Sequence, residues 1–326
     1  MTRRTSGFWV GVVLLGLTAM PVLAAPDQQR AIPPEAGEAL RNALLTLEQI
    51  KGSTLDSYWK ADAMALAMRT EARTGNAEAV GAMMRDTLVM IQTPSTAPVP
   101  AAFSAGPLYA ILAQGMDDLR DASNTRGLVN LSSQELVKIP DPAVLANVYP
   151  YLAQIAFDLG DADGARSMIG VANQSAAKVK ASREKTSALA LVAMADAKIG
   201  DAAAAAAAIQ AARGELPGIT DPADRAIAQA IIGRAEAANH NGPAARTLAR
   251  GAATDYDAGT AKADRSMLQA VKTLGLIALA QAESGDKTAA RTTIKALRHT
   301  AESLTNPFEQ LIGWLTLADT IIQVER

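Results

Sequence analysis

The sequence predicts an all-α protein built as an array of helix pairs. Hydrophobic residues make up 49% of the 326 residues but aromatic residues only 4%, and alanine supplies much of the apolar share. Alanine has the highest intrinsic helix propensity, and Val, Ile and Tyr never alternate with polar residues here as they do in strands. A third observation, an internal repeat, gives the order of the helices.

The repeat is visible in two segments, 112–128 and 152–168, which align without a gap at a spacing of 40 residues. Stepping along the chain finds six equivalent turns at spacings of 45, 40, 40, 40 and 45 residues. They are Gly75-Asn76, Arg120-Asp121, Gly160-Asp161, Gly200-Asp201, His240-Asn241 and Gly285-Asp286. Glycine ends a helix in a left-handed conformation and Asp or Asn caps the next helix, so each unit is expected to be helix, tight turn, helix.

Small residues stand at fixed places in these units, where they allow the two helices of a pair to approach closely. Seven positions before the turns stand Ala113, Ala153, Ala193, Gly233 and Ala278, and five positions after them Ala165, Ala205, Ala245 and Ala290. The seven consecutive alanines of residues 202–208 are therefore expected to begin a packed helix with Ala205 facing inward. A flexible tether would contain Gly, Ser or Pro instead.

The units extend over residues 54–305, which we expect to form a right-handed superhelical array of about six antiparallel helix pairs. Residues 25–34 are expected to be a disordered leader and residues 35–53 an N-terminal helix. Residues 306–326 predict a C-terminal helix that caps the apolar face of the last pair. Residues 93–107 contain four prolines and no charge, which fits either a hinge or a loop packed on the array.

The first 24 residues predict a secretory signal peptide. Arg3 and Arg4 precede an apolar run over residues 8–20, and Val22-Leu23-Ala24 forms a small-x-small cleavage motif. Cleavage is expected after Ala24, which places the mature protein in the periplasm or outside the cell. The alternative is an uncleaved membrane anchor, which the shortness of the apolar run disfavours.

Charge and composition argue against several kinds of partner. The chain has 31 basic and 33 acidic residues without a basic stripe, so no nucleic-acid partner is expected. There is no cysteine, which excludes disulfides, thiolate metal sites and a cysteine nucleophile. His240 and His299 have no second ligand nearby in the sequence, so no metal or other cofactor is expected.

The units resemble the tetratricopeptide-like αα-repeat superfamily. The resemblance lies in the small residue before the turn, the Gly-Asp-like turn, the alanine five residues later, Ala212 and Pro217. The units are longer than the usual ~34 residues, and their length alone would also suit a HEAT-type array. The resemblance implies protein or peptide binding on a concave surface and no catalytic residues. The family's groove positions fall on Arg69, Arg73, Gln114, Asn147, Gln154, Met194, Arg234 and Leu279.

The sequence therefore favours a periplasmic, non-enzymatic scaffold that binds a protein or peptide on the concave face of the array. Two alternatives stay open: an envelope glycan-active enzyme that uses Asp or Glu carboxylates, and a structural subunit of an envelope assembly. Glycan hydrolysis needs only two carboxyl groups flanking a bond, and the chain has 33 acidic residues. No acid stands in an obviously apolar sequence context that would raise its pKa, which ranks the enzyme lower.

Overall fold

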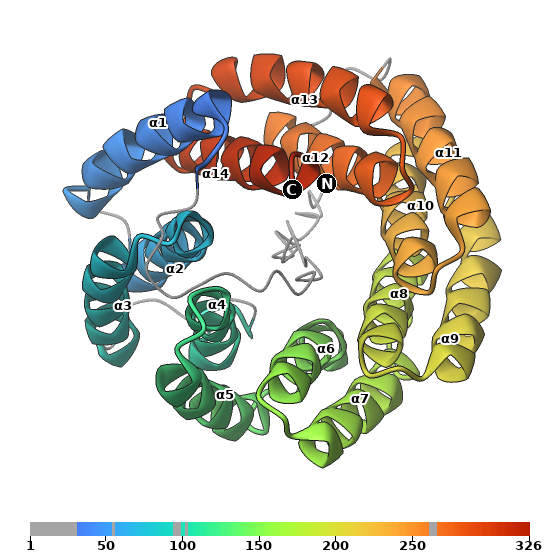
Figure 1. Ribbon diagram of the computed structural model, residues 1–326, viewed down its shortest axis with the longest axis horizontal. Helices are drawn as coiled ribbons and strands as arrows, with labels where there is room; N and C mark the ends of the chain where they lie inside the picture. The colour runs from blue at the N-terminus through green and yellow to red at the C-terminus, as the bar shows by residue number, and fades with distance from the viewer. Residues whose placement is uncertain (1–30, 54–55, 94–98, 102–103, 261–265) are drawn as a thin grey trace, which may run out of the picture.

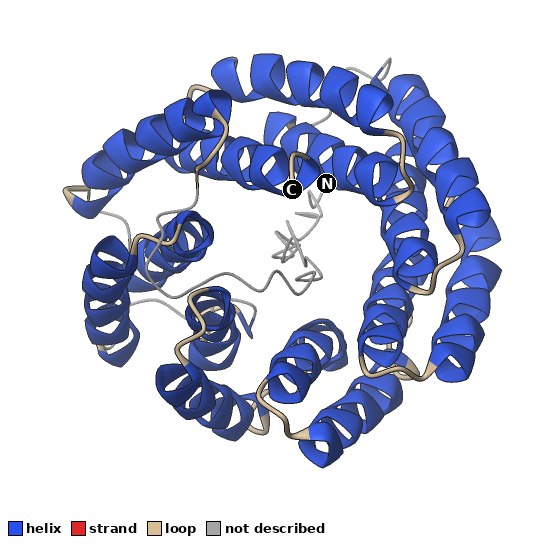
Figure 2. Cartoon of the chain, viewed as in Figure 1, coloured by secondary structure: helices blue, strands red, loops and turns tan. Residues whose placement is uncertain are grey.

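The computed structural model describes residues 31–53, 56–93, 99–101, 104–260 and 266–326. Within these ranges the regular elements are helices, and no strand occurs (Figure 2). The predicted signal peptide, its cleavage site and parts of the proline-rich segment 93–107 lie outside the described residues. The all-α class expected from the sequence is confirmed.

The helices form two concentric layers around a central axis (Figure 1). The inner layer consists of α2 (Ser57–Thr74), α4 (Ala105–Asp118), α6 (Pro142–Asp158), α8 (Ser182–Lys198), α10 (Pro222–Ala238), α12 (Met267–Glu283) and α14 (Pro307–Val324). The outer layer consists of α1 (Pro34–Lys51), α3 (Ala77–Gln92), α5 (Ala122–Leu136), α7 (Ala162–Ala176), α9 (Ala202–Glu215), α11 (Gly242–Thr260) and α13 (Lys287–Glu302). Each of the helices α3 to α13 in the outer layer packs on the inner helix before it, which confirms the predicted pairs.

The turns between paired helices have the predicted backbone geometry. All six turn residues have a positive φ, including Arg120 at 62° and His240 at 60°, the two positions where the turn is not glycine. In five of the six turns the following Asp or Asn then caps the outer helix, as where the Asp161 side chain accepts a hydrogen bond from the Gly164 N–H at 2.8 Å. The Asn241 side chain instead donates to the Glu236 carboxylate at 2.8 Å. The six repeated turns found in the sequence therefore mark the C-terminal ends of the inner helices from α2 to α12.

The alanine-rich segment is an ordered helix of the outer layer. Residues 202–208 begin α9, where Ala205 is fully buried and Ala203 and Ala207 are exposed. The small residues before the turns are buried as well. A Cβ atom placed on Gly233 would lie 3.3 Å from the Leu248 Cβ and 3.4 Å from the Ala245 carbonyl oxygen, so the close helix approach requires a small residue there.

The array closes on itself, which the repeat pattern of the sequence did not predict. The last helix, α14, packs on α12 and α13 as a cap would, but it also pairs with α1 and contacts α2. The seam is sealed by an edge-to-face contact between Trp59 and Phe308, whose ring centroids are 5.0 Å apart, and by an ion pair of 3.2 Å between Arg298 and Glu38. Closure removes the exposed apolar end faces that an open repeat array must shield.

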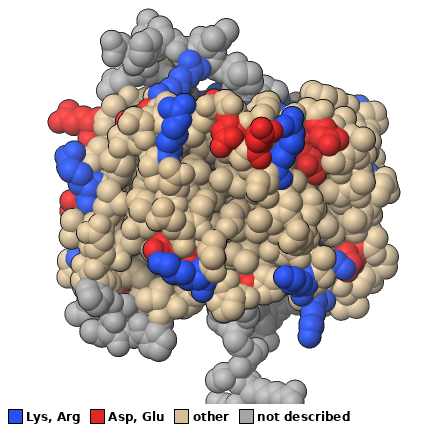
Figure 3. Space-filling model, turned by 90° about the horizontal axis from the view of Figure 1, so that it is seen from below, with Lys and Arg blue, Asp and Glu red and all other residues tan. Residues whose placement is uncertain are grey.

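The side of the ring that Figure 3 shows carries its charge mainly near its edges. Figure 3 views the ring from below, and Lys, Arg, Asp and Glu gather along the upper and lower edges of that face with a broad uncharged band between them. No helix among the described residues is long and apolar enough to cross a membrane.

Candidate binding site on the inner face of the ring

Buried charge gathers in the inner layer. In the part of the chain that the structure describes, every charged residue counted as buried lies on an inner helix: Asp62, Arg69, Glu71, Arg73, Asp196, Arg234, Glu236 and Asp319. Burying a charge costs free energy unless partners compensate it, so the contacts of these side chains indicate what each one does.

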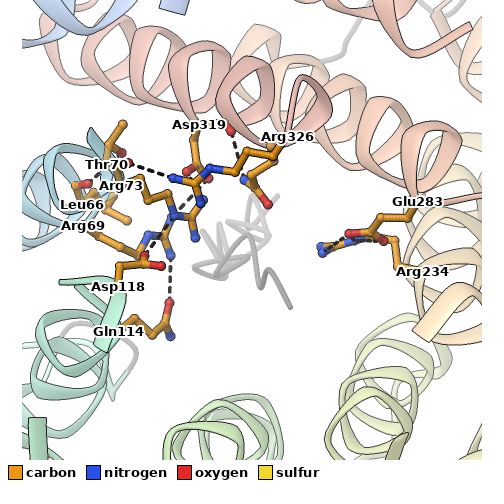
Figure 4. A network of polar contacts seen from close by, with 11 residues as sticks. Leu66, Arg69, Thr70, Arg73, Gln114, Asp118, Arg234, Glu283, Asp319 and Arg326 are labelled. Atoms are coloured by element: carbon orange, nitrogen blue, oxygen red, sulfur yellow. Dashed lines mark hydrogen bonds and ion pairs between the residues drawn. The ribbon is translucent and has the colours of Figure 1, made fainter. Parts of the chain in front are cut away.

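Two arginines of α2 form the centre of the largest cluster. The Arg73 guanidinium lies between two carboxylates, since its Nε is 3.1 Å from the Asp118 Oδ2 and its Nη1 pairs with the Asp319 Oδ1. Arg69, one turn earlier, has its Nη2 3.9 Å from the Asp319 Oδ2. Figure 4 shows these side chains converging from α2, α4 and α14 on the inner side of the ring. The cluster therefore joins the first and last inner helices across the seam.

Arg69 also fixes the orientation of a neighbouring amide. Its Nη1 donates a hydrogen bond of 3.2 Å to the Gln114 Oε1, which leaves the Gln114 Nε2 directed elsewhere. That Nε2, the Arg69 Nε and the Gln154 Nε2 are buried donors without a hydrogen-bond partner in the structure, and the Asp319 Oδ2 is a buried acceptor without one. Buried polar groups are nearly always hydrogen-bonded, so these four unmet groups on inner helices, among ten such atoms in the described residues, require an explanation.

These residues share one register position. Arg69, Gln114 and Gln154 each stand six residues before a turn, and the three helices that carry them, α2, α4 and α6, are neighbours in the inner layer. Asp319 occupies the same position in α14, because it stands 40 residues after Leu279. Asp319 was not predicted, although the sequence carries a signal for it: one more 40-residue step from Gly285 places Ala318 seven positions before the next turn position, where the other units have a small residue.

The other predicted groove residues do not join this cluster. Arg234 pairs with Glu283 of α12 by hydrogen bonds of 2.8 to 3.1 Å, and Figure 4 shows this pair across the ring from Arg69 and Arg73. The Asn147 amide donates to the Ala143 carbonyl of its own helix at 2.7 Å. Met194 and Leu279 are buried in the hydrophobic core. The structure thus brings together Arg69, Arg73 and Gln114 of the predicted set, with Gln154 on the next inner helix.

The two arginines differ in their electrostatic surroundings. Burial lowers the pKa of Arg69, and Asp319 opposes that effect only in part. Burial also lowers the pKa of Arg73, but Asp319 and Asp118 outweigh it and the net shift is upward. The positive charge of Arg73 is therefore balanced by two nearby carboxylates, while the positive charge of Arg69 is compensated less.

Four acids, Asp62, Glu71, Asp117 and Asp196, have raised pKa values, with burial as the largest cause for each, which corrects the expectation that none would. Burial raises the pKa of Asp62 to about 7 and that of Asp196 to about 6. Burial, Asp158 and Asp118 together raise the pKa of Asp117 to about 7 against the opposing charge of Lys198. The sequence context could not show this, because the desolvation arises from helices that are packed together in the ring.

A small pocket lies beside the arginine cluster. Its volume is about 320 Å³, and its lining residues are Ala31, Ile32, Pro33, Arg73, Ile322, Glu325 and Arg326. The Arg326 Nη2 donates to the Arg73 carbonyl oxygen at 2.8 Å, so the end of the chain is anchored at the same place. The pocket therefore adjoins the end of α2 that carries Arg73.

The described residues contain no group of His, Cys, Asp and Glu side chains that could hold a metal ion. No protein-family model, no curated protein and no solved structure matches the chain. The geometry of the inner face is therefore the evidence for its role. Its main features are hydrogen-bond donors without partners on adjacent inner helices and an arginine cluster whose charge is balanced by carboxylates.

Proposed function

We propose that this protein is a non-enzymatic scaffold of the bacterial periplasm that holds a protein or peptide on the inner face of its helical ring. The observation that carries the proposal is the set of three buried N–H donors without partners, on Arg69, Gln114 and Gln154. They occupy one register position on three neighbouring inner helices. These donors lie buried beneath the inner surface, so a ligand with acceptor groups would complete their hydrogen bonds only after the side chains turn toward the axis of the ring.

The free-energy argument favours a ligand over a purely structural role. An unmade hydrogen bond on a buried polar group costs ~1–3 kcal/mol. Apolar side chains at these positions would avoid that cost, as Met194 and Leu279 do at the same register position of α8 and α12. The polar members are explained if their side chains turn toward the axis when a partner binds and supplies the missing acceptors.

The resemblance to tetratricopeptide-like repeats supports the same proposal. In that superfamily the inner helices of the pairs line a concave surface that binds proteins or peptides, and here the corresponding helices face the axis of a closed ring (Figure 1). Closure would surround the partner instead of presenting it a one-sided groove. Binding energy would then come from side chains on several inner helices.

Photo-crosslinking in cells tests the proposal directly. A benzophenone amino acid replaces Gln154 of the inner helix α6 or, as the matched control, the exposed Gln174 of the outer helix α7. We expect one or a few defined protein adducts from the inner position and none from the outer one. Adducts from the outer position alone would contradict the proposal and favour the structural subunit of an envelope assembly.

Export is part of the proposal, and the same preparation tests it. The predicted signal peptide implies that protein recovered from the periplasmic fraction begins at Ala25. N-terminal sequencing of the purified protein measures this. An intact Met1 on protein recovered from the cytosol would contradict periplasmic localisation.

A second candidate function rests on a different observation, the raised pKa of Asp117. A carboxyl group with a pKa of about 7 can act as a general acid at neutral pH, and Asp158 is a second acid close enough to shift that pKa. This arrangement would suit an envelope glycan hydrolase. Release of reducing ends from purified cell-wall glycan, present with the parent protein and lost in Asp117→Asn, would favour this function over the scaffold.

A further inference from the structure

We infer that α1 is a releasable strap: by packing on α14 it holds the ring closed, and its release opens the ring between α2 and α14 while the other helix pairs stay folded. Such a motion is independent of which ligand the inner face binds. Three features of the seam support it: how α1 is connected, how it is held, and where unmatched polar groups lie.

The connection of α1 differs from that of the other outer helices. Each of the helices α3 to α13 in the outer layer follows its inner partner across a tight turn and packs on it. By contrast, α1 packs on α14, at the other end of the described chain, and contacts α2, the next helix in sequence, less extensively. Separating α1 from α14 therefore breaks no turn between paired helices.

The start of α1 also lacks a support that most outer helices have. Helices α3, α5, α7, α9 and α13 each begin with an Asp or Asn side chain that accepts a backbone N–H. In α1 the residue before the helix is Pro33, which provides no side-chain cap. A missing cap weakens a helix. The large buried side chains of α1, Leu40, Leu47 and Ile50, hold it in place without that help.

The two ends of α1 are held differently. At its C-terminal end, the Lys60 ammonium of α2 donates to the carbonyl oxygens of Lys51 and Ser53 at 3.1 and 2.7 Å. At its N-terminal end, Glu38 pairs with Arg298 of the neighbouring helix α13 at 3.2 Å (Figure 1). The Glu38 side chain is 52% exposed, and exposed ion pairs are weak and screened by salt. We therefore expect α1 to detach from its N-terminal end and to stay attached to α2 at the other.

Unmatched polar groups gather at the seam that α1 closes. Ten buried side-chain atoms of the described residues have no hydrogen-bond partner, and six of them lie singly on six helices away from the seam. The other four lie on the two helices that meet at the seam, α2 and α14: the Asp62 Oδ1, the Arg69 Nε, the Asp319 Oδ2 and the Thr320 Oγ1.

Opening the seam would admit water to these four atoms and to the buried ion pair between Arg73 and Asp319. Burial of polar and charged groups costs free energy, part of which hydration returns. Apolar contacts within a helix pair gain nothing comparable from water. The seam is therefore the junction of the ring that separates most readily once α1 has left α14.

The absence of cysteine allows the strap to be locked by engineered thiols. Glu38→Cys and Arg298→Cys place two thiols where α1 meets α13, and a bismaleimide that contains a reducible disulfide links them; we call this the seam lock. Lys185→Cys and Glu215→Cys, linked in the same way, are the matched control. Their parent side chains form an ion pair of 2.7 Å between α8 and α9, away from the seam.

Hydrogen exchange of the full mature protein, followed by mass spectrometry, measures opening at residues 61–74 of α2 and 311–322 of α14. We expect the seam lock to slow exchange of these amides at least about tenfold relative to the same protein after the linker is reduced. The lock between α8 and α9 should leave them unchanged.

A weakened strap should have the opposite effect. Leu47→Ala removes a side chain of α1 that is 1% exposed, so it should speed exchange of the same α2 and α14 amides at least about tenfold. Ile209→Ala, at an equally buried position of α9, is the matched control and should speed exchange mainly in α8 and α9.

Two results would overturn the inference. One is unchanged exchange of the α2 and α14 amides when the seam lock is closed, because α1 would then not hold these helices together. The other is an equal effect of both locks on these amides, because the seam would then open only when the whole ring unfolds. The locks decide the question even if Leu47→Ala does not fold.

Discussion

The inner and outer layers of the ring are built by the same repeat but differ in what they bury. Inner helices carry the buried charged side chains, including Arg69, Arg73 and Asp319. Outer helices face the core with alanine and aliphatic residues, as Ala205 and Ile209 of α9 do, and their charged residues stay at least partly exposed. Within the described chain, the buried charged residues are thus confined to the layer that faces the axis.

This difference suggests that the two layers have different roles, the outer layer in folding and the inner layer in binding. The outer layer needs only helix propensity and small residues at close contacts, which explains why a run of seven alanines is tolerated in α9. The inner layer buries charges, which adds nothing that apolar side chains of similar volume could not supply to stability. Its polar residues are therefore the positions where ligand binding is expected, and the following experiments test that distinction.

The largest effect is expected at the seam. Asp319→Ala removes the carboxylate shared by Arg73 and Arg69, so it leaves buried positive charge uncompensated. We expect the free energy of unfolding, measured by urea denaturation, to fall by about 3–5 kcal/mol.

Asp163→Ala is the control for this substitution, because the Asp163–Arg166 ion pair is exposed, with 98% and 64% of the two side chains accessible. It should change stability by no more than ~1 kcal/mol. Equal effects of the two substitutions would show that the inner and outer ion pairs do not differ as described.

A somewhat smaller effect is expected in α9, where the outer layer contacts the core. Ala205→Glu would bury a carboxyl group at a fully buried, closely packed position and should lower stability by about 2–4 kcal/mol. Ala203→Glu, two residues earlier on the exposed face, should stay within about 0.5 kcal/mol. Thermal and urea unfolding measure both variants, and similar stabilities would mean that α9 is not packed as the ring requires.

The smallest effect concerns the pH dependence of stability. Asp117 has a pKa of about 7 in the folded protein against the ordinary aspartate value of 3.8, so between these two pH values the folded state holds a proton that the unfolded chain has lost. Its contribution to stability is therefore full below pH 3.8 and is lost progressively as the pH rises to about 7.

Asp117→Asn should remove that loss. One pKa unit corresponds to about 1.4 kcal/mol, and partial solvent access reduces the effect, so the variant should gain about 1 kcal/mol over the parent between pH 4 and pH 8. Urea unfolding at both pH values measures the gain, with the exposed Asp163→Asn as the control. A parallel pH profile for Asp117→Asn and the parent would contradict the raised pKa.

Much of the fold could be predicted because its signals are local and periodic. The repeated turns, including the non-glycine turns at Arg120 and His240, each depend on a positive φ at a single residue. Their positions can therefore be recognised in the sequence. The inward position of Ala205 follows from its fixed distance to the turn. Part of the candidate site was also accessible, because Arg69, Gln114 and Gln154 share one register position.

Other features depend on contacts between distant parts of the chain. The unmatched donors could not be predicted, since whether the Gln114 Nε2 has a partner depends on how Arg69 orients the amide. The raised pKa of Asp117 comes from desolvation and from Asp158 on the next inner helix. Neither effect leaves a pattern in the residues next to it.

The sequence by itself determined helix content, pairing and the register that places one residue of each unit on the same inner position, because propensity, capping and close packing act over a few residues. Only the tertiary structure decided that the array closes, with α14 paired to α1 and Asp319 brought to Arg73, 246 residues away in the chain. That outcome depends on small rotations between successive helix pairs, which add up around the whole ring. No local stretch of sequence encodes their sum.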